Sequence, residues 1–403
     1  MPLSFYYKSA ILLFFFVQGN IFAILLLRKG IEHAHNASKW LSLFVFLCCL
    51  YITPWMLGHE GWYAVDGYRE FLFFVPFQQL FLIGPVIYFY TQSLLNPNFQ
   101  LSKKALVHFL PALVYLLYSL IIFIVDQFLL DQYYFYADGR DKDLAPWYQI
   151  SGLLSMMIYT TLSIKYYYKY RQQIFQELSF ADSVVFNWMQ KYLVALWIML
   201  VLRLLFLILY PEWGDFGAKW WYYFLFACLS YYIALTGYTN TIATIVSFRV
   251  NAFEMEPRPL PALQNKQVIF ENKHSKMAGQ VADPSLQAWK TKISDLMEKE
   301  QLYQNPTLTL SDVASTLGTT TKQVSSVINQ GFGMNFNDFV NHYRVEAFKA
   351  LLQRGEHQQY TILSIALACG FNSKTTFNRV FKRCTTLTPI QYVSQLKHNE
   401  SNS

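Results

Sequence analysis

The stretch that decides the fold of the C-terminal part is IALACGFNSKTTFNRVFKRCTTLTPIQY, residues 365–392. Apolar residues recur at helical spacing before and after Gly370. A glycine at this point ends the first helix because it takes a positive φ at no steric cost. Ser373 follows where a side-chain oxygen can cap a second helix. The pattern therefore predicts two short helices joined by a tight turn, a helix-turn-helix unit.

The same unit occurs twice along the chain. Positions in the segment 313–330 recur 52 residues further on before the turn and 53 residues further on after it. The equivalent pairs are Ala314 and Ala366, Gly318 and Gly370, Thr320 and Ser373, Val324 and Phe377, Val327 and Val380, and Ile328 and Phe381. We interpret the repeat as one structural unit used twice, with a helix near 336–352 between the copies.

Burial of the apolar positions leaves a polar face on the second helix of each copy. In the first copy this face carries Lys322, Ser325, Ser326 and Asn329, and in the second it carries Lys374, Thr375, Asn378, Arg379, Lys382 and Arg383. Basic side chains on such a helix suit contacts to DNA phosphates and base edges. A connecting helix of about 18 residues spans about 27 Å, close to the roughly 34 Å between successive major-groove faces. One chain would then read two adjacent segments of double-stranded DNA.

This region resembles the AraC/XylS family of bacterial transcription regulators. The matching residues are Ile365, Ala366, Gly370, Phe371, Ser373, Phe377, Arg379, Phe381, Lys382, Thr388, Pro389 and Tyr392. The resemblance covers roughly 285–397. It implies base-reading positions at Lys322, Ser325 and Ser326 in the first unit, and at Lys374, Thr375, Asn378 and Arg379 in the second. Thr386 stands where the family usually has glycine, so we expect the loop there to need another backbone conformation.

The N-terminal part has a different composition. The whole chain of 403 residues is 54% apolar, 18% aromatic and 14% charged, and its long apolar runs end near residue 240. A helix that crosses a bilayer needs about 20 mostly apolar residues. Seven segments qualify, near 10–27, 40–58, 71–93, 105–125, 147–165, 192–210 and 220–239. The sequence therefore predicts an all-α protein, a seven-helix transmembrane bundle followed by the double helix-turn-helix domain.

Basic residues predict the orientation of the bundle, since loops rich in Lys and Arg stay in the cytoplasm. The odd-numbered loops carry Arg28, Lys29, Lys39, Lys103, Lys104, Lys165, Lys169, Arg171 and Lys191, against Glu32, Glu177 and Asp182. The even-numbered loops are mostly acidic. We therefore expect the N-terminus outside and the C-terminal domain in the cytoplasm of a bacterium, below its inner membrane.

One charge falls inside a predicted span. Arg203 lies in the sixth segment, and Gln78 in the third segment is a candidate companion. A buried cation in a membrane is costly unless it pairs, binds an anion or extends to the interface. Two interpretations stay open: a structural or interfacial arginine, and contact with an unknown signal ligand.

The remaining predictions concern organisation and function. We expect a transmembrane sensor domain over 1–240, a juxtamembrane segment and flexible linker over 241–284, the DNA-binding domain over 285–397 and a short tail over 398–403. The chain carries none of the common nucleotide, hydrolase or zinc-protease motifs, so we expect no enzyme, no cofactor and no metal. The expected partners are DNA, the lipid bilayer and a signal ligand or protein, with a homodimer as one arrangement. The competing interpretation is a transporter or channel with a regulatory cytoplasmic domain.

Overall fold

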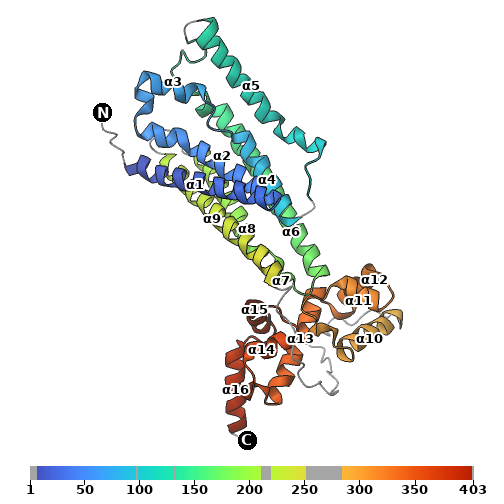
Figure 1. Ribbon diagram of the computed structural model, residues 1–403. Coiled ribbons are helices and arrows are strands. Elements are labelled where there is room, and N and C mark those ends of the chain that lie inside the picture. The colour runs from blue at the N-terminus through green and yellow to red at the C-terminus, as the bar shows by residue number, and fades with distance from the viewer. Residues whose placement is uncertain (1–6, 97–98, 131–132, 210–218, 251–283, 402–403) are drawn as a thin grey trace. The chain divides into compact units, whose positions relative to one another are not determined.

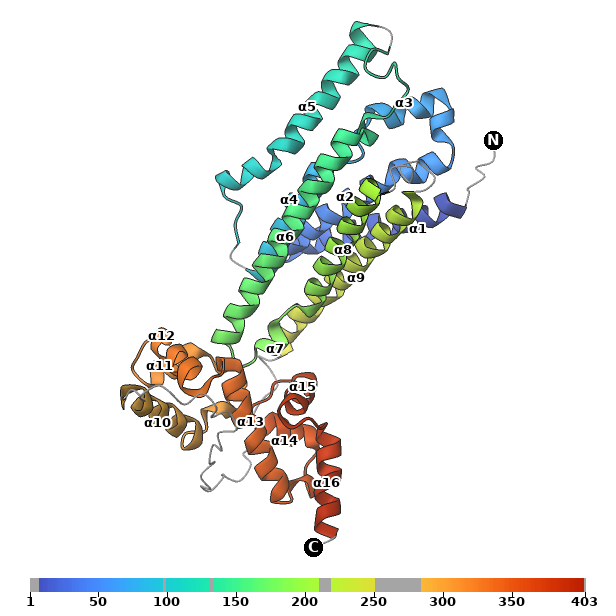
Figure 2. The same cartoon turned by 180° about the vertical axis from the view of Figure 1, so that it is seen from behind.

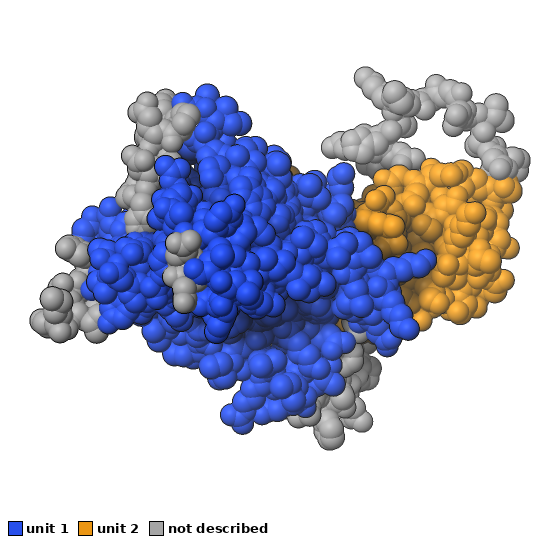
Figure 3. Space-filling model, turned by 90° about the horizontal axis from the view of Figure 1, so that it is seen from above, with its two compact units in different colours: residues 1–168, 186–254 blue, residues 169–185, 255–403 orange. Residues whose placement is uncertain are grey.

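The computed structural model describes residues 7–96, 99–130, 133–209, 219–250 and 284–401 (Figures 1 and 2). The described residues are helical apart from turns, loops and one antiparallel bridge between Leu178 and Thr309. The chain forms two compact units, one of residues 1–168 and 186–254, the other of residues 169–185 and 255–403 (Figure 3). The segment 169–185 thus belongs to the same unit as the C-terminal domain. Residues 251–283, which hold most of the predicted linker, lie outside the described residues.

The first unit is a bundle of long apolar helices. Its helices are α1 (Tyr7–Glu32), α2 (Asn36–His59), α3 (Asp66–Phe74), α4 (Leu80–Leu95), α5 (Leu110–Ile124), α6 (Pro146–Glu177), α8 (Asn187–Leu209) and α9 (Trp220–Val250). Helix α2 packs against α1, α4 and α9, and it supplies much of the buried core, including Phe44 and Trp55. The C-terminal end of α6 enters the second unit at Lys169.

The third predicted span, 71–93, is not one helix. Helix α3 ends at Phe74 and α4 begins at Leu80, because Pro76 has no N–H to donate and pushes the residue before it out of the helical region. Val75 accordingly has φ −90° and ψ 115°. Gln78, which the sequence analysis put inside the span, lies in this break and is buried.

Four helices of the described residues are long and apolar enough to cross a membrane, against the seven expected. They are Tyr7–Glu32, Asn36–His59, Lys103–Leu129 and Asn187–Leu209. The stretch Lys103–Leu129 consists of a 3₁₀ turn, α5 and a π turn. Helix α4 is apolar but shorter, at 16 residues.

The second unit is built of short helices around one long one. It holds α7 (Ala181–Val184), α10 (Pro284–Glu298), α11 (Leu310–Thr316), α12 (Thr321–Val327), α13 (Phe336–Gln353), α14 (Ile362–Ala368), α15 (Lys374–Thr385) and α16 (Pro389–Ser401). Helices of 7 residues such as α11 and α14 are not stable alone, so tertiary packing must supply their stability. Phe348 of α13 contacts the rings of Phe377 and Phe381, and so joins α15 to the long helix.

The two helix-turn-helix units have the predicted turns and caps. Gly318 ends α11 with φ +63° and Gly370 follows α14 with φ +93°. The hydroxyl of Thr320 accepts a hydrogen bond from the Gln323 N–H, and that of Ser373 accepts one from the Thr376 N–H. The connecting helix α13 has the 18 residues that were expected. These local predictions are confirmed.

The prediction for Thr386 is wrong. Thr386 has φ +65°, the left-handed conformation that glycine adopts easily and other residues adopt at a cost. Its N–H donates to the Lys382 carbonyl at 2.8 Å and closes the end of α15. The loop therefore takes a left-handed residue at this point even without glycine.

Candidate nucleic-acid interface

Helix α15 has one buried and one exposed face. Thr376, Phe377, Val380 and Phe381 are buried in the domain core. The exposed residues include all six predicted contact residues of this helix: Lys374, Thr375, Asn378, Arg379, Lys382 and Arg383. Four of these six side chains are basic. Such a face can neutralise phosphates and reach base edges.

Helix α12 presents a smaller and less charged face. Val324 and Val327 are buried in the domain core. On the other side of the helix Lys322 is exposed, and Ser325 and Ser326 are half-buried. Serine hydroxyls both donate and accept hydrogen bonds, so they can contact base edges or phosphates. The first helix-turn-helix unit therefore offers one cation and short polar groups, whereas the second helix-turn-helix unit offers most of the positive charge.

Arg344 of α13 forms hydrogen bonds in the region between the two helix-turn-helix units. It is 1% exposed, and it donates to the Tyr303 carbonyl at 2.8 Å and to the Asn305 carbonyl at 2.7 Å. It also donates to the backbone and hydroxyl oxygens of Ser179. Burial lowers the pKa of this guanidinium to about 9. Sequence reasoning gave Arg344 no role.

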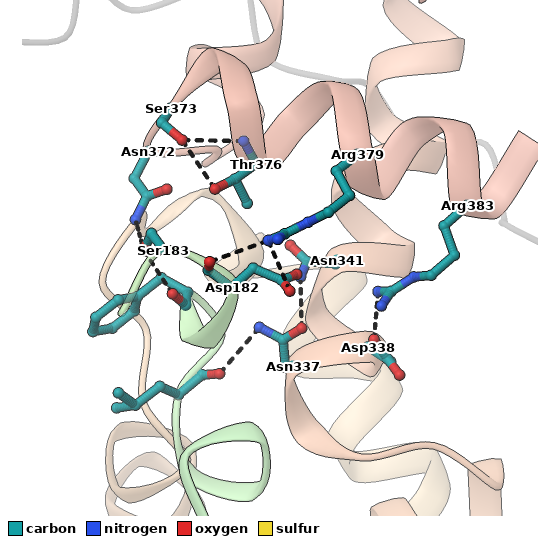
Figure 4. A network of polar contacts seen from close by, with 12 residues as sticks. Asp182, Ser183, Asn337, Asp338, Asn341, Asn372, Ser373, Thr376, Arg379 and Arg383 are labelled. Carbon is teal, nitrogen blue, oxygen red and sulfur yellow. Dashed lines mark hydrogen bonds and ion pairs between the residues drawn. The ribbon is translucent and has the colours of Figure 1, made fainter. Parts of the chain in front are cut away.

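Two of the predicted DNA-contacting arginines already have acidic partners. Arg379 forms an ion pair with Asp182 at 2.8 Å, and Arg383 forms one with Asp338 of α13 (Figure 4). Asp182 comes from the segment between α6 and α8, and sequence reasoning counted it only as a loop charge. Its local sequence contains no pattern that indicates a partner, so the contact emerges only from the fold.

Arg203 lies on an aromatic ring in the first unit. Its guanidinium carbon is 4.9 Å from the centre of the Tyr222 ring, at a distance typical of a cation–π contact. Arg203 also lines a cavity of about 20 Å³ with Tyr51 and Gln149, which is room for about one water molecule.

Gln78 belongs to a buried polar cluster around the break between α3 and α4. Its N–H donates to Asp143 at 2.9 Å, and its side chain donates to the Tyr51 carbonyl and accepts from Gln149. Tyr51 and Gln149 therefore contact the Gln78 side chain and, together with Arg203, also line the small cavity.

Two acidic residues of the loop before α6 complete this cluster. Asp141 and Asp143 are buried, and they accept hydrogen bonds from the hydroxyls of Tyr63 and Tyr115 respectively. Burial raises the pKa of both carboxyl groups, and the neighbouring Asp143 raises that of Asp141 further. Sequence reasoning had pointed only to acidic outer loops. No group of three or more His, Cys, Asp or Glu suited to a metal ion occurs in the described ranges.

The fold and the exposed faces of α12 and α15 define a helix-turn-helix DNA-binding domain. Residues 313–395 match the family model described as a helix-turn-helix domain. The chain is 32% identical over 101 residues to an uncharacterized HTH-type transcriptional regulator of Staphylococcus aureus strain COL, and the match covers 25% of this chain and 13% of that protein. It is 33% identical over 92 residues to the regulatory protein PocR of Salmonella typhimurium, and this match covers 23% of this chain and 29% of PocR.

The C-terminal domain is therefore a helix-turn-helix domain of the AraC type. The chain spans about an eighth of the length of the Staphylococcus relative and less than a third of PocR. No solved structure matches the chain.

Proposed function

We propose that this chain is a membrane-embedded, sequence-specific DNA-binding transcription regulator that couples an external or intramembrane signal to promoter binding. The observation that carries the proposal is the exposed basic face of α15, supported by a second helix-turn-helix unit and by regulator relatives. The same chain carries apolar helices long enough to cross a bilayer. In this proposal the bundle lies in the bacterial inner membrane and the C-terminal domain lies in the cytoplasm.

The DNA-binding part is tested by comparing two basic residues of α15. We expect Arg379→Ala to weaken binding to a preferred duplex by about 1–3 kcal/mol and to relax base preference at one position, because an arginine can read guanine bidentately. Lys382→Ala should weaken binding to all duplexes about equally and reduce the slope of log K against log salt by about one unit. The measurement is a salt titration with the full chain in lipid nanodiscs and duplexes selected from a random pool.

Equal behaviour of the two variants would contradict the assignment of Arg379 to base reading. Failure of the full chain to enrich any duplex at low salt, in every variant tested, would contradict DNA binding itself.

The membrane part is supported by apolar side chains on the outside of the first unit. Ile24 of α1 is 66% exposed and Val114 of α5 is 57% exposed. Exposed apolar side chains also line the rest of these two helices: Phe14, Val17, Ile21, Leu27, Ile31, Leu110, Leu113, Leu117, Leu120 and Ile121. Soluble proteins seldom leave such large contiguous apolar surfaces to water. Lipid chains would cover them at no cost in hydrogen bonding, because the helices satisfy their own backbone groups.

Topology is tested with reporter fusions. An enzyme active only outside the membrane should be active when fused within 59–70 or 126–146, and inactive when fused within 28–39, 94–104 or after 250, because the basic loops stay inside. An active fusion after residue 250 would put the DNA-binding domain outside the cytoplasm and would contradict the proposal that the chain regulates transcription.

A further inference from the structure

A short segment that runs from the last turn of α6 toward α8 contacts both recognition helices, α12 and α15. The Gln176 side-chain oxygen accepts hydrogen bonds from Ser325 of α12 at 3.5 Å and from Asn329, in the π turn that follows α12, at 3.2 Å. At the other end, Asp182 pairs with Arg379 of α15. We call residues 176–183 the docking segment. It therefore contacts predicted base-reading residues in both helix-turn-helix units.

The middle of the docking segment is held by α13. The Ser179 carbonyl accepts hydrogen bonds from Asn337 at 2.9 Å and from Arg344 at 3.2 Å. The Ser179 N–H donates to the Leu308 carbonyl at 3.1 Å, beside the bridge between Leu178 and Thr309. Ser179 is fully buried, as is Ala181. This burial and the backbone pairing distinguish the docking segment from a loop that merely touches the surface.

The second recognition helix is contacted by charge and by hydrogen bonds. The Asp182 carboxylate lies 2.8 Å from the Arg379 guanidinium, which also donates to the Asp182 carbonyl at 3.1 Å. Asn372, in the turn before α15, donates to the Ser183 hydroxyl at 3.1 Å (Figure 4). The Asp182 side chain is 7% exposed and that of Arg379 is 45% exposed. A carboxylate on this arginine holds the place that a phosphate or a guanine edge would take.

DNA and the docking segment require the same atoms. A duplex that engages both recognition helices needs the polar face of α12, where Gln176 contacts Ser325, as well as the polar face of α15. It also needs the guanidinium of Arg379, which cannot pair with Asp182 and contact a base or phosphate in the same geometry. We propose that residues 176–183 act as an internal competitor of DNA, so that the domain binds DNA only after this segment leaves α12, α13 and α15.

The chain itself links this competition to the apolar unit. The docking segment begins in the last turn of α6 and leads on to α8, and the basic-loop rule puts it on the cytoplasmic side with the C-terminal domain. A signal that moves α6 relative to α8 would pull on the segment and change its hold on the DNA-binding face. This inference rests on the proposed DNA-binding function and adds the element that controls it.

The test removes the Asp182 charge in the full chain. We expect Asp182→Asn to lower the Kd for a fluorescein-labelled 30-bp duplex, selected from a random pool with this variant, by about three- to tenfold, the range of one partly buried ion pair. Glu177→Gln is the matched control, because it removes one negative charge from an exposed position of the same segment. It should leave Kd within about twofold of the unaltered chain. An equal gain in both variants would mean that general charge repulsion, and not occlusion, sets the affinity.

A reversible cross-link tests occlusion directly. Ser183→Cys and Asn372→Cys place two thiols where hydroxyl and amide now lie 3.1 Å apart, in a background with the exposed Cys384 changed to serine. The oxidised protein should bind the duplex at least tenfold more weakly than the same protein after reduction, with each single-cysteine variant unaffected by oxidation. Equal binding by the oxidised and reduced forms, with the cross-link verified by mass spectrometry, would overturn the inference and leave DNA binding intact. Failure of every form to bind would instead overturn the proposed function.

Discussion

Gly370→Ala should destabilise the C-terminal domain by about 3 kcal/mol, from positive φ and steric overlap together. Gly370 has φ +93°, and a Cβ at this position would lie 2.3 Å from the Tyr303 carbonyl oxygen and 2.9 Å from the Gln304 Cα. Both contacts are backbone atoms, which cannot turn aside as a flexible side chain would. The measurement is hydrogen exchange of the buried amides of α13 and α14 in the full chain, which reports the free energy of local opening.

Gly318→Ala is the matched control for this prediction. Gly318 holds the equivalent position of the first helix-turn-helix unit and has φ +63°, but a Cβ there would meet nothing within 4 Å. We expect a loss of about 1 kcal/mol from the positive φ alone. Similar losses in the two variants would show that the close approach of Gly370 to Tyr303 contributes nothing.

Arg344→Leu should destabilise the same domain by about 3 kcal/mol, since it leaves buried carbonyl groups without a donor. The Tyr303 and Asn305 carbonyls lose the 2.8 Å and 2.7 Å hydrogen bonds from this guanidinium, and Ser179 loses two more contacts. Leucine fills part of the volume but donates nothing. Hydrogen exchange in α13 and in residues 302–305 measures the effect.

Arg354→Leu is the control for the loss of a cation from α13. Arg354 is exposed at the C-terminal end of the helix, where substitutions usually change stability by less than about 0.5 kcal/mol. An equal loss in the two variants would mean that charge, and not the buried hydrogen bonds, is what the helix needs. Because Gly370 and Arg344 both meet the Tyr303 carbonyl, we expect their effects to fall short of additivity in the double variant.

The sequence alone determined the local architecture of the C-terminal domain. The turns at Gly318 and Gly370, the caps at Thr320 and Ser373 and the buried side of α15 all lie within a few residues of the pattern that predicts them. Helix caps and apolar spacing act over one or two turns, so they can be read from a short stretch. The exposed contact residues of α15 follow directly from the buried ones.

Hydropathy was a weaker guide in the apolar part. It predicted a single helix over 71–93, although the break at Pro76 had a local cause that hydropathy does not weigh. It also gave no sign that Gln78 would meet Asp143, because the two residues are 65 positions apart. The sequence also named Gln78 as a candidate companion of Arg203, and only the fold shows that Arg203 lies over the ring of Tyr222.

The tertiary structure decided what distinguishes residues that the sequence treats as equivalent. Gly318 and Gly370 occupy matching positions of a repeat, yet only Gly370 lies against the backbone of residues 303–304. Asp182 and Glu177 are two acids of one segment, yet only Asp182 has Arg379 as its ion-pair partner among the described residues. Asp182 and Arg379 are 197 positions apart, and contacts over such separations depend on how the whole chain packs. Local patterns therefore determined the two recognition helices, and only long-range packing decided which part of the chain lies on them.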